Sequence, residues 1–272
     1  MTGHGTEEMR GIIPRAMEQI GMYKLDLERR GWTYSMEVSY VEIYNENIRD
    51  LLRTTPNDDV KHEIRKDVNG NVTLSEVTMR VLDPNDSDAV NELIATAQTH
   101  RSTASTAMNE VSSRSHAVFS LQLRAHNESQ GITLKGSLSL VDLAGSERLD
   151  RSGATGSRMK ETIAINKSLS ALVDVFAAIG NKQSHVPYRN SKLTYLLQPA
   201  LSGDGKALML VNLSPTTESI PESICSLRFA SHVNRCELGK AKRQIVTESD
   251  TAVSMPSILP QSSQIKKVPR LR

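Results

Sequence analysis

The pattern of apolar and polar residues along the chain predicts strands that are covered on both faces. Met36 and Val38 fall on one face of a strand predicted at residues 33–44, while Val41 and Ile43 fall on the other. We therefore expect both faces of this strand to be partly buried. Further strands are predicted at residues 116–125, 132–143 and 206–213, and residues 62–82 are predicted to form a hairpin that turns at Asn69 and Gly70.

Apolar residues at helical spacing predict helices between these strands. The last helix is expected to begin with a capping box, because residues 219–222 read Ser-Ile-Pro-Glu. Strands that alternate with helices imply an α/β fold with a layered sheet, in which ligands bind at the carboxyl ends of strands. Beyond residue 243 the chain is rich in Ser, Pro and Gln, which predicts a flexible tail at residues 244–272. The helices are predicted at residues 14–30, 87–101, 158–180, 191–201 and 219–235.

The composition is that of a globular protein with no strong charge bias. Charged residues make up 24% of the 272 residues, hydrophobic residues make up 38%, and the net charge is +2. The C-terminal end is more basic, since seven Lys or Arg and only two acidic residues follow Gly239. This end either favours an acidic partner or is an ordinary solvated tail.

Cysteine usage and hydropathy set limits on the compartment. The two cysteines lack metal-site spacing, so both thiols are expected to be free, and Cys225 is interpreted as a small core residue. The histidines are scattered and form no zinc-type motif. No apolar run approaches the roughly 20 residues that a membrane-spanning helix needs, and the N-terminus has no signal-peptide pattern. We expect a soluble intracellular protein.

Two segments carry groups that suit nucleotide chemistry. A predicted apolar strand ends at Asp142, and Gly145 follows three residues later. In nucleotide hydrolases an Asp at such a place holds Mg²⁺, usually through water, and a Gly amide can approach a γ-phosphate because no side chain intervenes. Taken alone, this pattern is a weak signal and favours a strand that simply ends in a turn. Residues 109–116 supply clustered hydroxyls that can bind Mg²⁺ or phosphate, although a polar surface loop has the same composition.

Together the two segments resemble one known family. Residues 109–116 read Asn-x-x-Ser-Ser-Arg-Ser-His and residues 142–147 read Asp-Leu-Ala-Gly-Ser-Glu, which closely resemble switch I and switch II of the kinesins. Residues 41–52, 165–172 and 185–194 agree with that family in type and order. The resemblance covers residues 1–243. It implies a P-loop NTPase-like kinesin motor fold, with a mixed central sheet flanked by helices, that lacks its N-terminal strands and P-loop.

The resemblance implies a site for ATP and Mg²⁺. Ser113 and Asp142 would hold Mg²⁺, partly through water, and Gly145 would sense the γ-phosphate through its amide. Arg114 and Glu147 would form the ion pair that closes the switches and orders the attacking water, since phosphoryl transfer depends on positioning and charge stabilisation. The family assigns Asn109, Ser112, Ser113, Asp142 and Gly145 to nucleotide and Mg²⁺ binding, and Ser113, Arg114 and Glu147 to catalysis.

The resemblance also implies microtubules as the partner. The helix from about residue 158 is similar to the relay helix that lies on tubulin, and basic side chains there suit the acidic tubulin surface. Such binding should be sensitive to salt. Without the family match, the same side chains would be read as an ordinary solvated face. The matching microtubule-facing residues are Lys167, Tyr188, Arg189 and Lys192, whereas Leu169, Leu172, Val173 and Phe176 are interpreted as core.

The C-terminal part points to one branch of the kinesins. Residues 233–243 look like the end of a kinesin-14 motor, in which the stalk precedes the motor. This implies minus-end-directed movement and a homo- or heterodimer through a coiled-coil stalk that lies outside these residues. It also implies a cytoplasmic place on the microtubule cytoskeleton, with the spindle as one such place. No nucleic-acid partner is expected.

The sequence departs from the family at the phosphate-binding loop. No Gly-x-x-x-x-Gly-Lys-[Ser/Thr] occurs in the chain, and in a kinesin Met1 would lie a few residues past that loop. The family also places the missing strands in the centre of its sheet, so the strand predicted at residues 206–213 would lose a neighbour and expose unpaired backbone.

Three hypotheses account for this departure. The chain is a fragment of a motor ATPase, or it is a nucleotide-independent microtubule-binding module. The complete switch segments favour the first. An unrelated Mg²⁺-dependent, GTPase-like switch protein would explain Asp-x-x-Gly but not the other matching stretches.

Overall fold

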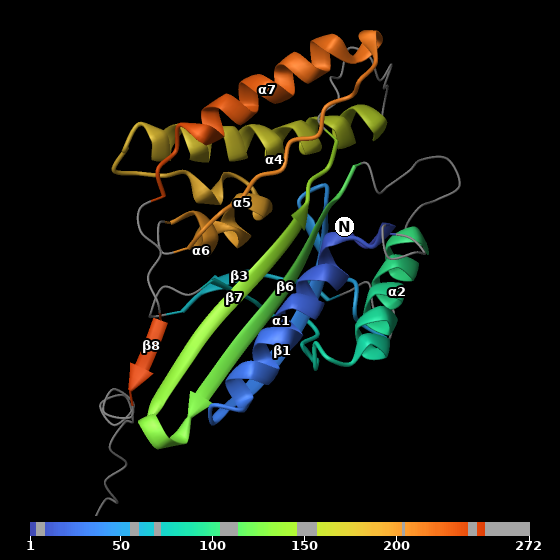
Figure 1. The fold of residues 1–272 in the computed structure, drawn as a ribbon. Helices are drawn as coiled ribbons and strands as arrows, with labels where there is room; N and C mark the ends of the chain where they lie inside the picture. The colour runs from blue at the N-terminus through green and yellow to red at the C-terminus, as the bar shows by residue number, and fades with distance from the viewer. Residues whose placement is uncertain are drawn as a thin grey trace, which may run out of the picture.

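Three long antiparallel strands form the centre of the sheet (Figure 1). They are β1 (Trp32–Tyr44), β6 (His116–Asn127) and β7 (Ile132–Asp142). The computed structural model describes residues 1–3, 9–54, 60–67, 72–103, 114–145, 157–202, 205–238 and 244–247. Within these ranges the strand order is β2-β1-β6-β7-β8, and β5 also pairs with β1. The outer strands are β2 (Asn47–Asp50), β5 (Arg80–Val81) and β8 (Gln244–Thr247).

Helices cover both faces of this sheet (Figure 1). One face carries α1 (Ile12–Glu28) and α2 (Ser87–Thr103). The other carries α4 (Ser157–Gly180), α5 (Lys192–Leu196) and α6 (Gln198–Leu201), with α7 (Ile220–Asn234) packed on α4. The expected α/β fold is therefore confirmed. The sequence predicts a mixed sheet, and every pairing among the described strands is antiparallel.

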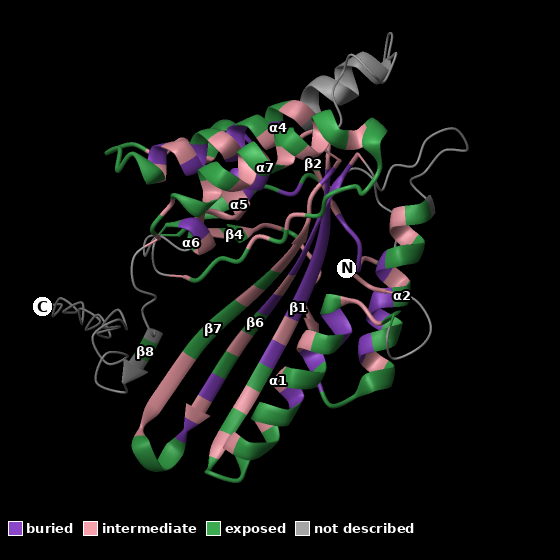
Figure 2. Ribbon diagram, turned by 45° about the horizontal axis from the view of Figure 1, so that its top comes forward, coloured by how far each residue is buried: buried purple, intermediate pink, exposed green. Residues whose placement is uncertain are grey.

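Strand β1 contributes to two separate hydrophobic cores, as its pattern predicts. Met36 and Val38 pack into the core beneath α1 and α2. Val41 and Ile43, on the opposite face, pack into the core beneath α4 and α5, and each is 1% exposed. Figure 2 shows that burial is concentrated in β1 and β6, whereas β7 has only half-buried and exposed residues.

The predicted helices and long strands are confirmed, with local differences. Residues 191–201 form two short helices with a break at Leu197, because Pro199 follows closely and cannot continue a helical hydrogen-bond ladder. The hairpin is shorter than predicted, since β3 (Ile64–Lys66) pairs with β4 (Val72–Leu74) and β5 pairs with β1 instead. Its predicted turn at Asn69 and Gly70 lies outside the described residues. The remaining turns of helix are η3 (Glu128–Gln130), η4 (Tyr188–Asn190) and η5 (Thr217–Ser219).

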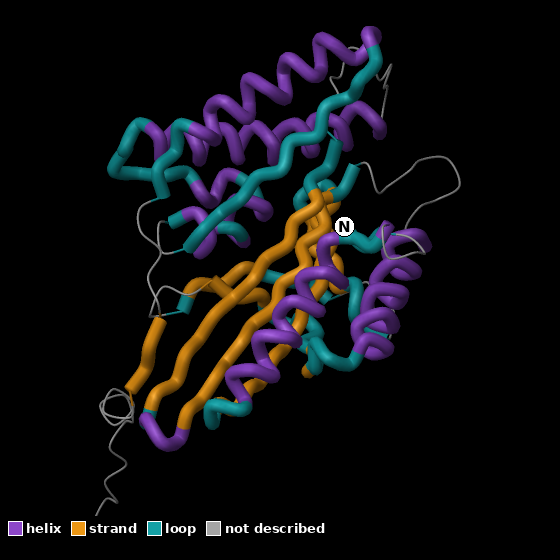
Figure 3. The backbone as a smooth tube through the Cα atoms, viewed as in Figure 1, coloured by secondary structure: helices purple, strands orange, loops and turns teal. Residues whose placement is uncertain are grey.

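The strand predicted at residues 206–213 is wrong. Residues 205–216 run as a loop (Figure 3), and none of the described residues pairs with them as a strand. The side chains of Leu208 and Leu210 are 86% and 66% exposed. An apolar sequence alone does not make a strand, because the backbone also needs a neighbouring strand to accept and donate its hydrogen bonds.

Three smaller expectations also change. Cys225 is exposed, so its interpretation as a core residue is wrong: α7 packs on α4 with one side only. Ser219 makes no capping bond to α7, because it already belongs to the turn η5 and its hydroxyl accepts a hydrogen bond from Thr216. Residues 244–247 form strand β8 beside β7 within the segment predicted as a tail, and residues 248–272 lie outside the described ranges. The division of the chain at residue 243 stays a prediction.

The exposure of residues 206–213 gives a direct test with matched substitutions. Leu208→Ala should change the free energy of unfolding by less than about 0.5 kcal/mol, because the side chain is already in water. Leu121→Ala, at a position 2% exposed in β6, should lower it by about 2–5 kcal/mol. Urea unfolding of both variants measures the difference. Equal losses would mean that residues 206–213 are buried after all.

Candidate functional site

The two segments with nucleotide-type chemistry meet at one end of the sheet. In the β6–β7 ladder, Ala117 lies opposite Asp142, which is the last residue of β7. This register brings residues 114–116, just before Ala117, close to the loop at residues 143–145. The fold therefore places the end of the first segment beside the start of the second.

Several predicted site residues cannot be placed. Asn109, Ser112, Ser113 and Glu147 lie outside the described residues, so their roles and the Arg114–Glu147 ion pair stay predictions. Arg114 is half-buried at the start of β6, and Asp142 and Gly145 are half-buried at the end of β7. The structure thus brings together Arg114, Asp142 and Gly145 from the predicted set.

Arg101, which the sequence analysis did not select, holds this end of the sheet together. It lies in the last turn of α2, and its Nη1 is 3.5 Å from an Asp142 carboxylate oxygen. Its Nη2 donates to the backbone oxygen of Ser115 at 3.1 Å, and its Nε lies 3.4 Å from a carboxylate oxygen of Glu42. One guanidinium therefore links α2, β1, β6 and β7. Its fixed planar fork suits such multiple contacts.

Glu42 is the buried anion of this cluster. Its side chain is 2% exposed, and the Ser115 hydroxyl donates to it at 2.6 Å. A buried carboxylate is stable only when it is paired and hydrogen-bonded, and Arg101 and Ser115 meet that need. The signal was visible in the sequence, because Glu42 interrupts an apolar strand between Val41 and Ile43. Its partners were not visible, since they come from distant segments.

His116 forms a second, uncharged link at the same end of the sheet. The backbone N–H of Ala144 donates to its Nδ1 at 2.9 Å, and its Nε2 lies 2.7 Å from the Ser168 hydroxyl of α4. His116 and Ser168 are 3% and 2% exposed. Burial, helped by the positive charge of Arg101, lowers the pKa of His116 from 6.5 to about 4. The ring is therefore neutral near neutral pH.

The predicted microtubule-facing residues lie on α4, η4 and α5, which pack together on one face of the sheet. Lys167 and Arg189 are exposed, and the Arg189 guanidinium lies 5.5 Å from the centre of the Tyr195 ring. Lys192 is half-buried, and its backbone N–H donates to Glu46 at 2.9 Å. Of the four, the structure therefore presents Lys167 and Arg189 most fully to a partner.

Tyr188 differs from the other three predicted contacts. It is half-buried, its hydroxyl donates to the backbone oxygen of Leu201 at 3.2 Å, and burial raises the pKa of its phenol. The adjoining helix α5 begins with a capping box in which the Ser191 and Thr194 side chains bind each other's backbone N–H groups. These bonds fix the backbone that carries Arg189 and Lys192.

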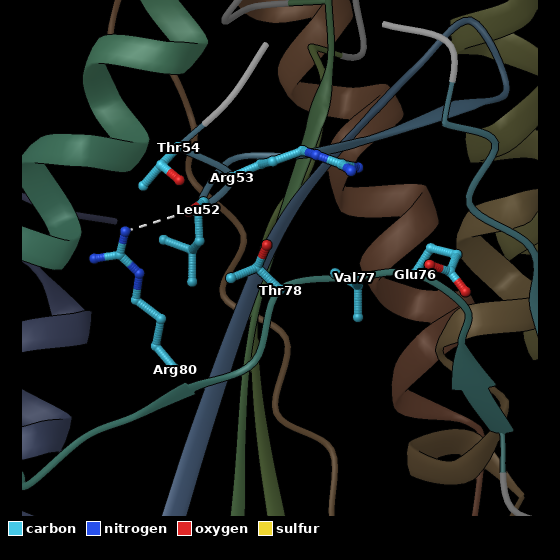
Figure 4. A pocket seen from close by; sticks show the side chains of 7 residues that line it. All are labelled: Leu52, Arg53, Thr54, Glu76, Val77, Thr78 and Arg80. Atoms are coloured by element: carbon cyan, nitrogen blue, oxygen red, sulfur yellow. Dashed lines mark hydrogen bonds between the residues drawn. The ribbon is translucent and has the colours of Figure 1, made fainter. Parts of the chain in front are cut away.

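A cavity of about 490 Å³ lies elsewhere, between the chain just after β2 and the chain that leads into β5 (Figure 4). It is lined by Leu52, Arg53, Thr54, Glu76, Val77, Thr78 and Arg80, none of which the sequence analysis assigned to a site. Arg80 is held by the backbone oxygen of Leu52 at 3.3 Å, and the Arg53 side chain points away from it. The two guanidinium groups do not converge on one ligand.

Among the described residues, no cluster of three or more His, Cys, Asp or Glu could hold a metal ion. Asp142 can still contribute to Mg²⁺ binding, because its side chain is 43% exposed and carboxylate oxygens and water are the ligands that Mg²⁺ prefers. None of the helices in the described ranges is long and apolar enough to span a membrane.

The buried pair of Glu42 and Arg101 predicts a large loss of stability on neutralisation. Glu42→Gln keeps the shape but removes the charge that compensates the guanidinium, so we expect the free energy of unfolding to fall by about 3 kcal/mol. Glu92→Gln, on the exposed face of α2, is the matched control and should change it by less than about 0.5 kcal/mol. Urea unfolding compares the two. A similar small effect of both would contradict the buried pair.

The lowered pKa of His116 predicts a pH-dependent stability. As pH falls, the unfolded chain binds a proton near the ordinary pKa of 6.5, before the folded chain does. The contribution of His116 is therefore complete above that pH and declines towards pH 4. We expect about 2 kcal/mol less stability at pH 5 than at pH 7.5 from this residue. The difference between the pH profiles of the unsubstituted chain and His116→Asn measures it; identical profiles would exclude a neutral buried imidazole.

Comparison with known proteins identifies the family of this chain. Residues 1–236 match the family described as Kinesin motor domain. Kinesin-like protein KIN-14N of Oryza sativa subsp. japonica is 53% identical over 247 residues, which cover 89% of this chain and 32% of that protein. Kinesin-like protein KIFC1 of Homo sapiens is 48% identical over 244 residues, which cover 88% of this chain and 36% of that protein. The chain spans about a third of the length of these curated relatives.

Solved structures extend the match to three dimensions. The motor domain of the kinesin-like protein Kar3 of Saccharomyces cerevisiae is 46% identical with a TM-score of 0.72, over 84% of this chain and 68% of that one. The C-terminal motor and motor homology domain of Kar3Vik1 has 46% identity and a TM-score of 0.74, over 83% of this chain and 58% of that one. The chain has the kinesin motor fold and belongs to the kinesin motor-domain family, with relatives of the kinesin-14 type at about half identity.

Proposed function

We propose that this chain forms the nucleotide-switch and microtubule-binding part of a kinesin motor, whose intact form couples ATP hydrolysis to movement towards the microtubule minus end. The observation that carries the proposal is the register of β6 and β7, which pairs Ala117 with Asp142. It sets residues 114–116, the end of the first switch-like segment, beside residues 142–145, the start of the second. Kinesin motor domains are microtubule-stimulated ATPases, and the match to that family supports the same reaction here.

The site residues would act by position and charge. Bound Mg²⁺ and ATP would supply the reacting phosphate and its neutralising cation, with Ser113 and Asp142 holding the metal and Asn109 and Ser112 contacting the nucleotide. The Gly145 amide would donate to the γ-phosphate. This assignment is supported by the half-exposed Asp142 carboxylate, which can hold water molecules around a cation.

Catalysis would depend on the closing of the two switch segments. Arg114 and Glu147 would form an ion pair that closes them and orders the attacking water, while Ser113 would help to position the γ-phosphate. Ordered water and fixed charges are the main requirements of phosphoryl transfer.

Microtubules would bind on the face made by α4, η4 and α5. Lys167 and Arg189 are exposed there, and Lys192 and Tyr188 lie beside them with less exposure. Positive side chains suit the acidic surface of tubulin. We also propose a cytoskeletal location in the cytoplasm, spindle included, and a homo- or heterodimer through a coiled-coil stalk. The Kar3Vik1 match, whose structure is fused to a synthetic heterodimeric coiled coil, supports the dimer.

A second candidate function is a microtubule-binding module that does not use nucleotide. In that case residues 1–272, which contain no Gly-x-x-x-x-Gly-Lys-[Ser/Thr], would bind microtubules without the amides and lysine by which that loop holds the β- and γ-phosphates.

Co-sedimentation and ATP turnover together test these proposals. Residues 1–272 should pellet with microtubules in a salt-sensitive manner and show no microtubule-stimulated turnover. Lys167→Glu should weaken pelleting about three- to tenfold at low salt, because it reverses an exposed charge on the binding face. Arg29→Glu, an exposed charge at the end of α1 on the opposite face of the sheet, is the matched control.

Each result selects between the proposals. Equal weakening by the two reversals would contradict the proposed face, and failure of the unsubstituted chain to pellet would contradict microtubule binding. Turnover by a longer form of the protein that includes a phosphate-binding loop supports the motor. Specific pelleting by such a form with no turnover supports the binding module instead.

A further inference from the structure

We propose that His116 is a positioning residue that couples the loop after β7 to helix α4 through two hydrogen bonds. The inference rests on the proposed motor function. It assigns to a side chain of β6 the transmission of movement from the loop after β7 to helix α4. No predicted site residue takes part directly. The bridge consists of the Ala144 amide, the His116 imidazole and the Ser168 hydroxyl.

The geometry of the bridge is short and enclosed. The distance from the Ala144 nitrogen to Nδ1 of His116 is 2.9 Å, and Nε2 lies 2.7 Å from the Ser168 oxygen. The three residues are 5%, 3% and 2% exposed, so water does not compete for these bonds. Bonds of this kind gain strength in a medium of low dielectric constant.

The direction of both hydrogen bonds follows from one fact. A backbone N–H can only donate, so Nδ1 of His116 must be an unprotonated acceptor for Ala144. The neutral ring then carries its proton on Nε2, which donates to the Ser168 oxygen. A charged imidazole would lose the Ala144 bond. The lowered pKa of His116 agrees with this neutral form.

The two ends of the bridge lie next to the residues that matter for the proposed function. Ala144 immediately precedes Gly145, whose amide is proposed to sense the γ-phosphate. Ser168 immediately follows Lys167, which is exposed on the proposed microtubule face. A displacement of the loop backbone by a few tenths of an ångström must therefore either stretch the bridge or move α4. Packed interiors pass on such shifts because they have little free space.

A purely structural role makes a different prediction. If His116 only satisfies buried polar groups, its substitution lowers stability and lowers basal and microtubule-stimulated turnover by the same factor. If it positions α4 relative to the loop, its loss reduces the ratio of stimulated to basal turnover in protein that is still folded. The ratio therefore separates the two roles.

The variants each break one bond, and turnover is measured in a form of the protein that includes a phosphate-binding loop. His116→Asn keeps an acceptor near the Nδ1 position but is too short to reach Ser168. Ser168→Ala removes the hydroxyl from the other side. We expect each to lower the stimulated-to-basal ratio of kcat about three- to tenfold, the size of one hydrogen bond. The double variant should lose no more than either single variant, because all three remove the same bond. Ser170→Ala, exposed on α4, is the control and should leave the ratio unchanged.

The tautomer gives a test that needs no substitution. Nitrogen chemical shifts of ¹⁵N-labelled histidine in the 272-residue chain should assign the proton of His116 to Nε2 at pH 7. A proton on Nδ1, or on both nitrogens, would overturn the bridge even where a variant fails to fold.

Folded variants with an unchanged ratio of stimulated to basal turnover, or additive losses in the double variant, would overturn the coupling. If the unsubstituted form with a phosphate-binding loop shows no microtubule-stimulated turnover, the proposed function is overturned, and with it the coupling. If it turns over ATP but the variants leave the ratio unchanged, the coupling alone is overturned.

Discussion

The carboxylate of Glu42 is the constraint on which this end of the molecule depends. It sits inside the sheet with 2% of its side chain exposed, where an unpaired charge costs several kcal/mol. Its charge is compensated by Arg101 from α2, and the Ser115 hydroxyl donates a hydrogen bond to the same carboxylate oxygen. Because Arg101 also reaches Asp142, the position of the proposed Mg²⁺ ligand is fixed by the same buried charge. The ends of β1, β6 and β7 are thus held together by electrostatics as well as by their backbone ladders.

The sheet also separates two hydrophobic cores that share its strands. Phe119 packs beneath α1 and α2 and meets Tyr40 edge to face at 5.6 Å, whereas Val118, its neighbour, packs beneath α4 and α5. A shift of β6 is therefore felt by helices on both faces, since well-packed interiors have low compressibility. The polar site lies where this shared strand begins, at Ser115 and His116.

The sequence was sufficient where a long pattern of apolar residues matches the faces that an element buries. The two faces predicted for β1 match the two cores. Residues 206–213 show the limit of such reasoning. Their apolar pattern is as strong as that of a buried strand, but strand formation depends on a neighbour that local sequence cannot reveal. The same applies to Cys225, whose exposure depends on which side of α7 packs on α4.

The site was predictable only in part, for a related reason. Asp142 and Gly145 stand in a recognisable motif, so their pattern alone raised the question of nucleotide binding. Arg101 precedes Asp142 by 41 residues, and nothing in the sequence around it marks it as a partner. Only the register of the sheet and the end of α2 bring the two together. Residues 109–113 and Glu147 lie outside the described ranges, so their predicted roles still await a test.

The Arg101–Glu42 ion pair and the hydrogen bonds of His116 differ in the energy needed to break them. Separating Arg101 from Glu42 would leave the buried Glu42 carboxylate without its counter-ion, at a cost of about 3–5 kcal/mol, so this pair acts as a fixed frame. Each hydrogen bond of His116 is worth only about 0.5–1.5 kcal/mol and involves no net charge. It can be stretched or broken within the energy of a conformational change. The neutral imidazole is thus the part of this network that can move, and the nearby Arg101 charge helps to keep it neutral.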